Sequence, residues 1–524
     1  MIRYQSQHQL TFEEFRTPFE MHLSRENRWV KLAHVLPWDR LAAVYYRTMS
    51  ATQGRPATDA RVVIGALIIK HREVLSDEDT ILSIQENVYQ QYFLGLRQYQ
   101  YEWVFDPSLL VTIRKRLGEQ EFDAMVLELL QLADRFSTDV GTARASSSDE
   151  GTEGTSFPNS PSLADGGTER TGLSTSSSSS NEPALRQEAV TNRGLLMTDL
   201  TVAPADIAYP TDIELLNSAR EKTEEIIDEL YASIPVERRT TKPRTYRKKA
   251  RKEYLKFAKT KKRSGKTIRK AVRKQLGYVK RNIKTIHTLL DVVPETLSSA
   301  ERKTLWVVQE LYRQQQEMYT TKTHRIDDRI VSIAQPHVRP IVRGKAKAPT
   351  EFGAQVSCSV MNGFSRIHSI AWDSYHEASD LPAQIEEYKK TYGYYPQVVL
   401  ADKKYGTRDN RAYMRTHNII YGGTPLGRPR KDGDGQAVTK AVSNLRNHIE
   451  GKFGTGKRRY GLDRIMARRS DTSASWIAAI FFVMNIQTFI KFLVSSFLLL
   501  QTMVYAVWLQ HSPVMYSNFR FHRL

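Results

Sequence analysis

Three carboxylates lie in sequence surroundings that could support metal-dependent chemistry. Asp199 sits inside the apolar segment LLMTDLTV, where an ionised side chain is costly unless it is paired or bound to a metal. Asp402 ends the apolar segment VVLAD, the strand end at which α/β sheets place functional groups. Glu450 lies on a predicted helix, one turn after Arg446. If two strands and a helix bring the three carboxylates together, they could hold two Mg²⁺ ions, an arrangement suited to in-line phosphoryl transfer.

Other polar residues near these segments have simpler interpretations. They are predicted to be turn, cap, surface or hydrogen-bonded helical groups: Asp206, Asp212, Asp373, Glu377 and His448. Asp206 is the best substitute if Asp199 is not the first ligand. A metal-ligand role stays open for His448, because it lies beside Glu450. The simplest role for Arg446 is an ion pair with Glu450, worth roughly a few tenths of a kcal/mol on a helix.

The elements predicted around the carboxylates follow the order of an α/β domain. Asp199 lies on the first strand. From Arg325 onward the sequence predicts the strands IVSIAQ, QVSCSVMNG and IHSIAWD, the helix DLPAQIEEYKKTYG, the strand PQVVLAD, a polar helix, the strand NIIYGG and a helix over Ser443–Phe453. Strands and helices in this order predict an α/β fold with mixed strand pairing.

Composition divides the chain into four parts. Residues 1–136 are predicted to form a helical, DNA-binding domain. Within it, a helix over Asp59–His71 and its continuation after a short break have the outline of a helix-turn-helix, although an ordinary helical bundle fits as well. Residues 137–190 are rich in Ser and Gly and almost free of aliphatic side chains, which predicts a disordered linker. A second domain over 191–490 and an apolar tail over 491–524 follow.

The charge of the chain favours a polyanionic partner. Lys and Arg total 77 against 57 Asp and Glu, a formal net charge of +20. The excess is concentrated between Glu237 and Lys284, within a helical insertion predicted over about residues 213–325. Apolar residues recur there every three or four positions, so one helix face is predicted to pack and the cationic face to be functional. Phosphates release counterions when they are neutralised, but charge alone also fits a merely basic soluble protein.

Cysteine use and hydropathy bear on the compartment. Cys358 is the only cysteine, so no disulfide within the chain and no cysteine-based zinc site can form, which fits a reducing compartment. The N-terminus has no apolar segment of signal-peptide length, so secretion is not expected. The apolar stretch from Trp476 to Trp508 allows a tail-anchored membrane protein as an alternative. Asn485, Gln487 and Lys491 interrupt it, and we therefore prefer a buried or interface helix.

Several segments resemble one known family. Arg446, Glu450 and Lys457 match the spacing of the Arg–Glu–Lys signature of DDE insertion-sequence transposases of the IS-four/IS-five superfamily. The family has a tyrosine three residues before the arginine, and this chain departs from the pattern with Ser443. The N-terminal hundred or so residues resemble the family's helical domain. Three further segments are similar to its first-Asp motif, a strand of its core and its second-Asp motif: residues 198–220, 339–357 and 401–414.

The resemblance implies a DNA transposase on an RNase-H-like α/β core with a mixed sheet. Asp199, Asp402 and Glu450 would hold two Mg²⁺ ions, replaceable by Mn²⁺, which activate water to cut at the ends of a mobile element. The freed 3′-hydroxyl would then attack target DNA. Backbone phosphates would be held by four basic residues: Arg446, Lys457, Arg458 and Arg459. Tyr405 and Asn410 are weaker candidates for the site, as polar residues close to Asp402 in the sequence.

The resemblance also implies the partners of the chain. They are double-stranded DNA, at the terminal repeats and at the target, and further copies of the chain in a homo-oligomer that pairs two ends. The implied location is the cytoplasm, at the nucleoid, and no membrane partner is expected. Two alternatives stay open: a catalytically inactive, DNA-binding transposase remnant, and an RNase-H-like nuclease that cuts without joining.

Overall fold

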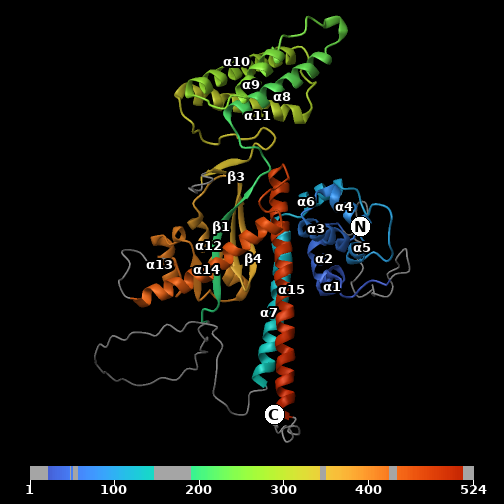
Figure 1. Cartoon of the computed structure of the whole chain (residues 1–524), viewed down its shortest axis with the longest axis vertical. Coiled ribbons are helices and arrows are strands. Elements are labelled where there is room, and N and C mark those ends of the chain that lie inside the picture. Colours follow the sequence, from blue (N-terminus) through green and yellow to red (C-terminus); the bar gives the residue numbers. More distant parts are fainter. Residues whose placement is uncertain are drawn as a thin grey trace, which may run out of the picture.

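A mixed β-sheet forms the centre of the second domain (Figure 1). The computed structural model describes residues 22–47, 49–50, 57–146, 191–342, 350–423 and 433–511. Within them, the strand order is β2-β3-β1-β5-β6, and β4 also pairs with β3. The strands are β1 (Leu195–Pro204), β2 (Arg339–Val342), β3 (Thr350–Met361), β4 (Phe364–Ala371), β5 (Val398–Ala401) and β6 (Ile420–Tyr421).

Strand directions and the covering helices identify the fold. β1 runs antiparallel to β3 and parallel to β5, and β5 runs parallel to β6. β3 and β4 form a hairpin that turns at Asn362 and Gly363, both with positive φ, as a two-residue hairpin turn requires. The predicted RNase-H-like α/β fold is confirmed. The helices of this domain that follow the hairpin are α12 (Leu381–Tyr392), α13 (Arg408–Thr416), α14 (Gly433–Arg459) and α15 (Ser470–His511).

One predicted strand is wrong. The segment IVSIAQ, residues 330–335, forms no strand, and the strand that enters the sheet is β2, which follows it. The backbone N–H of Ile330 donates to Gln314 Oε1 at 2.9 Å, and Ile330 and Val331 are buried by side chains. These apolar residues are therefore covered by packing, which the hydropathy of a short run cannot distinguish from strand pairing.

The N-terminal part is helical, as predicted. Every residue of α3 from Ala60 to His71 is buried, so this helix is the core of the unit. The next helix, α4, opens with three acids at 77–79, which does not suit a phosphate backbone. An ordinary helical bundle therefore describes this pair better than a helix-turn-helix. The helices are α1 (Arg28–Val35), α2 (Trp38–Tyr46), α3 (Ala60–Glu73), α4 (Asp77–Glu86), α5 (Val88–Phe93), α6 (Ser108–Arg116) and α7 (Glu119–Ser146).

The position of α7 bears on the predicted linker. α7 continues to Ser146, although the linker was predicted from residue 137. Residues 147–190, the rest of that segment, lie outside the described residues.

Helices between β1 and β2 form a lobe of their own (Figure 1). They bury two apolar clusters, one around Leu216, Val279 and Val308 and the other around Ile227 and Ile286. Because its core is its own, this lobe can carry a surface unrelated to the sheet. Its helices are α8 (Asp212–Ala232), α9 (Arg247–Ala258), α10 (Gly265–Leu290) and α11 (Ser299–Thr321).

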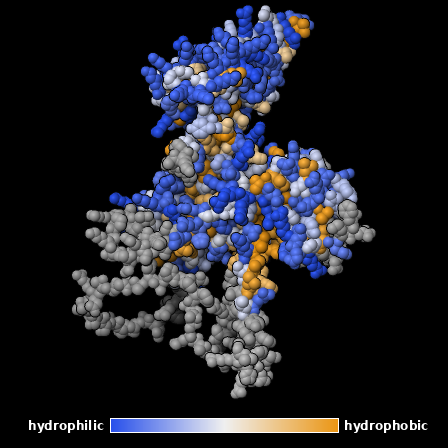
Figure 2. All heavy atoms as spheres, in the orientation of Figure 1, coloured by the Kyte–Doolittle hydropathy of each residue, from blue (hydrophilic) through white to orange (hydrophobic). Residues whose placement is uncertain are grey.

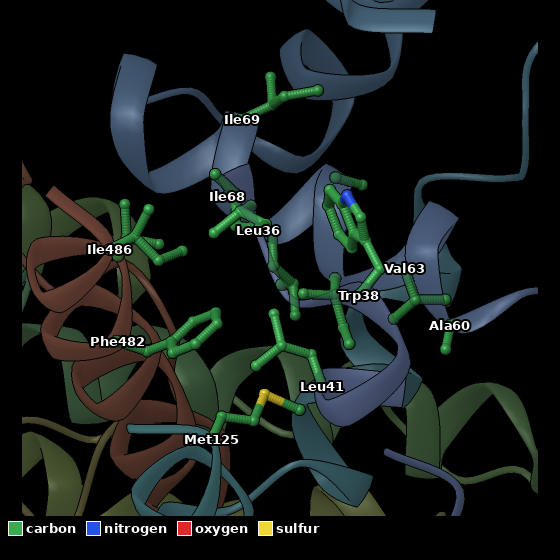
Figure 3. Close-up of a cluster of buried hydrophobic side chains, with 14 of the residues drawn as sticks. Leu36, Trp38, Leu41, Ala60, Val63, Ile68, Ile69, Met125, Phe482 and Ile486 are labelled. Carbon is green, nitrogen blue, oxygen red and sulfur yellow. The ribbon is translucent and has the colours of Figure 1, made fainter. Parts of the chain in front are cut away.

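Helix α15 packs against both parts of the protein. Phe482 and Ile486 lie among side chains of the N-terminal helices, including Leu41 and Met125 (Figure 3). Other α15 side chains, such as Phe481, lie against the sheet and α14. A helix covered on both sides is apolar all round, and this explains its composition.

The membrane alternative can be judged from this packing. Ser470–Leu498 is long and apolar enough to cross a membrane, but 61% of its most apolar stretch is buried inside the protein. This favours the predicted buried or interface helix. The helix also runs without a break past the predicted boundary between residues 490 and 491. After this buried stretch, the α15 side chains Val494, Phe497 and Leu498 are exposed. Apolar residues gather at the surface where α15 and α7 run together (Figure 2).

Charged side chains of the N-terminal unit surround Trp476 near the start of α15. Lys70 and Arg114 both pair with Asp77, at 2.9 and 2.5 Å. The Lys70 Nζ lies 4.4 Å from the centroid of the Trp476 ring, and the Arg114 guanidinium lies 5.2 Å from it. Cation–π contacts are strongest where they are shielded from water, so this cluster fixes α15 to the N-terminal unit.

A second tie joins the N-terminal unit to the sheet. Arg366 on β4 is buried, and its Nη2 donates to Asp123 on α7 and to Glu387 on α12, each at 2.7 Å. A buried arginine needs such partners, so α7, β4 and α12 are held at one point.

We predict that Phe482→Ala lowers the free energy of unfolding by about 3–5 kcal/mol, because it leaves a cavity between α15 and the N-terminal helices. Urea titration followed by circular dichroism measures this. The matched control is Phe497→Ala on the same helix, where the side chain is 60% exposed. The control should change stability by less than about 0.5 kcal/mol. An equal loss in both variants would contradict the two-sided burial of α15.

Candidate active site

Asp199 and Asp402 are neighbours because β1 and β5 are parallel and in register. The last residue pair of this ladder is Thr198 with Ala401, and each aspartate is the next residue along its chain. Residues of a strand alternate between its two faces, so Asp199 and the buried Thr198 point to opposite faces of the sheet. The first two predicted carboxylates are thus brought together by backbone pairing.

Backbone hydrogen bonds orient both aspartates. Asp199 Oδ1 accepts the N–H of Leu200 at 2.8 Å. Asp402 Oδ1 accepts the N–H of Lys403 at 2.7 Å, at the start of the 3₁₀ turn η5 (Lys403–Tyr405). Each carboxylate keeps its second oxygen for another partner.

Arg446 links Asp402 to Glu450. Its Nη1 donates to Asp402 Oδ1 at 2.9 Å, and its Nη2 donates to Glu450 Oε1 at 2.9 Å. The ion pair expected between Arg446 and Glu450 is present, and Asp402 shares it. The Nε–H of Arg446 is buried and has no acceptor among the described residues, so the two carboxylates do not satisfy the guanidinium fully. Arg446 is the counter-ion that joins α14 to the end of β5.

The surroundings of Asp199 oppose its ionisation. Its pKa is raised to about 6, first of all by burial and also by the charges of Asp402 and Glu377. The N–H of Leu200 and the guanidinium of Arg446 act in the opposite direction. A carboxylate that is buried beside other carboxylates is a site at which a cation would be favourable.

Glu377 belongs to this site, although the sequence predicted a surface or capping group. It opens the 3₁₀ turn η4 (Glu377–Asp380), its side chain is only 12% exposed, and its charge acts on Asp199. Its carboxylate accepts from Lys404 Nζ at 3.0 Å. Only its position after β4 could have signalled this, because a Glu in a polar loop is most often a surface group. Asp373 is exposed, as predicted.

The two weaker candidates on the second-Asp segment support the loops. Asn410 Nδ2 donates to the carbonyls of Ala378 at 2.8 Å and Tyr405 at 2.9 Å, so it ties η4 to η5. Tyr405 is fully buried among the apolar residues beneath η5, and burial raises its pKa. Both residues hold the backbone around Asp402 and Glu377 in place.

The basic residues predicted to hold phosphates lie on α14. At about 100° per residue, Arg446, Glu450 and Lys457 share one face of the helix. Arg458 and Arg459 follow in the last turn, exposed and rotated away from that face. His448 is also exposed.

The remaining acids have structural partners. Asp206 Oδ1 accepts from Arg464 Nε at 2.8 Å and is not joined to the other carboxylates, so it does not replace Asp199. Asp212, in the first turn of α8, accepts from Gln315 at 3.0 Å and from Arg329 at 2.7 Å. Both therefore have structural partners, but the predicted cap is not Asp212, because the N-cap of α8 is Thr211.

The donor set suits a hard divalent cation. Asp199, Asp402 and Glu450 offer carboxylate oxygens, the ligands that Mg²⁺ prefers. Among the residues that the structure describes, no three His, Cys, Asp or Glu side chains are grouped closely enough to hold a metal ion as they stand. Arg446 binds one oxygen of Asp402 and one of Glu450, so the other oxygen of each carboxylate is left for a cation.

Two family models of transposases match separate parts of the chain. The one described as "Transposase DDE domain" matches residues 399–487, which contain Asp402 and Glu450. The one described as "Transposase domain (DUF772)" matches residues 17–116, in the N-terminal helical unit. Residues 399–487 are therefore similar to a transposase DDE domain, and residues 17–116 to a second transposase domain. Asp199 lies between the two matched segments.

One curated relative overlaps part of the chain. It is described as an uncharacterized protein, ORF8 in the nfe locus of Rhizobium meliloti, and is 34% identical over 136 residues. The match covers 25% of this chain and 62% of the relative, less than two thirds of its length. No solved structure matches the chain.

We predict that Asp199→Asn stabilises the metal-free protein near pH 7.5. The pKa of Asp199 is raised in the folded state, so its ionisation opposes folding above about pH 6, by up to about 3 kcal/mol. The gain in melting temperature should shrink as pH falls through 6 and vanish below about pH 4, where Asp199 is protonated in both states. Thermal melts in EDTA measure it, and the exposed Asp463→Asn is the control. A gain that does not depend on pH would show that charge is not its cause.

Proposed function

We propose that this chain is a DNA transposase that cleaves at the ends of a mobile element and joins the freed 3′-hydroxyl to target DNA. One observation carries the proposal: Asp199 on β1 lies beside Asp402, which directly follows the parallel strand β5, and Arg446 ties Asp402 to Glu450. Two strands and a helix of an RNase-H-like fold thus contribute one carboxylate each, and the transposase matches cover two of these three residues.

In this proposal Asp199, Asp402 and Glu450 hold two Mg²⁺ ions, for which Mn²⁺ can substitute. A bound divalent ion supplies an activated water and stabilises the charge on the scissile phosphate. The protein supplies the carboxylates in fixed positions, because Asp199 is part of the central strand and Asp402 begins a turn closed by hydrogen bonds. Glu377 adds negative charge to the same place and favours cation binding there.

Arg446 is assigned two successive roles. In the metal-free protein it compensates the charge of Asp402 and Glu450. Once these carboxylates are engaged elsewhere, its planar fork of donors is free to bind a backbone phosphate. Lys457 lies on the same face of α14 and would hold the next phosphate. Arg458 and Arg459 would extend the contact around the helix end.

The partners in the proposal are double-stranded DNA and further copies of the chain. The duplex carries the terminal repeats or the target, and a homo-oligomer pairs two ends. The N-terminal helical unit is assigned to DNA binding, because the family model that matches it describes a transposase domain. The site of action is the cytoplasm, at the nucleoid.

We predict that Asp402→Asn abolishes cleavage of a labelled duplex that carries the flanking terminal repeat, while DNA binding stays almost unchanged. The substitution removes a carboxylate ligand and no phosphate contact. Glu450→Gln should behave in the same way. Wild-type cleavage should require Mg²⁺ and stop in EDTA. The matched control is Asp409→Asn, an exposed residue on α13, which should cut like the wild type.

The outcomes separate the alternatives. Loss of binding together with cutting in Asp402→Asn would count against the ligand assignment. Tight binding by the wild type without cutting in any metal would identify an inactive remnant. Cutting without strand transfer into a second duplex would identify a nuclease.

A further inference from the structure

The excess charge of the chain lies in one short segment. Residues 237–284 contain 22 Lys and Arg and two acids, a net charge of +20. This equals the net charge of the whole chain, so the remaining residues carry 55 charges of each sign. The attraction of the protein to a polyanion therefore has one main source, and it is not the carboxylate site.

The lobe of α8 to α11 separates its charges by helix. The segment 237–284 supplies α9 and most of α10, whereas α8 alone carries seven of the 14 acids between residues 212 and 321. A few bases of the segment are bound inside the lobe: Arg247 pairs with Asp228 at 2.8 Å, and Lys274 pairs with Glu253 at 2.7 Å. Hydrophilic residues cover most of the lobe in the view of Figure 2.

One face of α10 keeps its cations unpaired. The five basic residues on this face are exposed, and none of them forms an ion pair with a carboxylate of a described residue. At about 100° per residue they fall within about 40° of a single line along the helix. We call this line the α10 stripe: Lys266, Lys270, Arg273, Lys280 and Lys284, with Gly277 at its centre.

The bases beside the α10 stripe differ from those on it. The Arg269 guanidinium lies 4.0 Å from the centroid of the Tyr319 ring, and that of Arg281 lies 4.5 Å from the centroid of the Tyr246 ring. These flanking arginines stack on the lobe itself. The cations of the stripe are left for a partner outside it.

Gly277 points to a partner that comes close to the helix. Glycine is disfavoured inside helices, so its presence needs a reason. Packing is not that reason, because a Cβ at Gly277 would meet nothing within 4 Å. The bare backbone at this position leaves a flat gap in the row of cations. A sugar–phosphate backbone crossing α10 there can approach closely and be held by the cations on either side.

The chemistry of the α10 stripe selects duplex DNA. From Lys266 to Lys284 it is about 27 Å long, which corresponds to about eight base pairs. It has no aromatic side chain on which unpaired bases could stack. The apolar face of α10 is buried in the lobe, around Val272 and Val279, so the helix cannot insert into a lipid surface. Cations that contact phosphates position a duplex and carry no sequence information.

We propose that the α10 stripe docks the backbone of duplex DNA without regard to its sequence, on a lobe separate from the carboxylate site. The proposal rests on charge and geometry, and it holds whether or not the chain cuts DNA. Under the proposed function, this surface would hold DNA that the active site does not read.

The test measures binding of the full chain in EDTA to two duplexes of about 30 base pairs, one of random sequence and one with the terminal repeat. The stripe variant carries Lys270→Gln, Arg273→Gln and Lys280→Gln. The control variant carries Lys303→Gln, Arg325→Gln and Lys390→Gln, three exposed bases away from the stripe. Both variants lose three positive charges, so a difference in binding between them reflects where the charges lie and not the net charge.

For the stripe variant we expect the slope of log K against log[salt] to become shallower by about 2–3, with similar weakening on both duplexes. The control variant should keep the wild-type slope. Equal slopes in the two variants would overturn the proposal. A change confined to single-stranded DNA or RNA, measured in parallel, would also overturn it, because duplex is the ligand proposed. The binding assay is run in EDTA, where no metal-dependent cleavage takes place, so its outcome is separate from that of the catalytic proposal.

Gly277→Gln provides a second measurement. A side chain at this position should leave the melting temperature unchanged or raise it, because it meets no neighbour and glycine is disfavoured in helices. We expect duplex affinity to fall several-fold as the gap in the stripe is filled. Unchanged affinity would overturn the assignment of close approach at Gly277.

Discussion

The stretch of α15 from Trp476 to Phe489 is kept from water only while the N-terminal helices cover one of its faces and the sheet with α14 covers the other. This two-sided burial sets the positions of the remaining elements. Lys70, Asp77 and Arg114 fix the N-terminal unit to Trp476, and Arg366 joins α7 to β4 and α12. Helix α14 packs against the same part of α15, through Ile449 and Phe453. The packing that buries α15 therefore also places Glu450 near the ends of the strands.

The carboxylate site works against the stability that this core supplies. Burial and neighbouring charges oppose ionisation of Asp199, and Arg446 offsets part of the repulsion by binding Asp402 and Glu450. Such a site is poorly satisfied without a cation, which suits residues selected for chemistry. The excess positive charge of the chain is placed elsewhere, on a lobe with its own apolar core.

The sequence allowed much of this to be predicted, within physical limits. β1 and β5 were predictable because buried parallel strands are continuous apolar runs, and the aspartates at Asp199 and Asp402 interrupt or end them. IVSIAQ has the same hydropathy but is buried by packing, which no local pattern reveals. Glu377 was missed because only tertiary folding brings η4 to Asp199. The surroundings of α15 were ambiguous for a similar reason, since composition does not say what covers an apolar helix.

The place of α15 in the chain has a consequence for synthesis. The N-terminal helices and the first strands leave the ribosome long before residues 470–490, yet these residues complete the cores of both parts. Early segments must therefore wait with part of their apolar surface uncovered. A nascent chain that stops before α15 has neither core closed. Closure of both cores therefore waits for the synthesis of one helix.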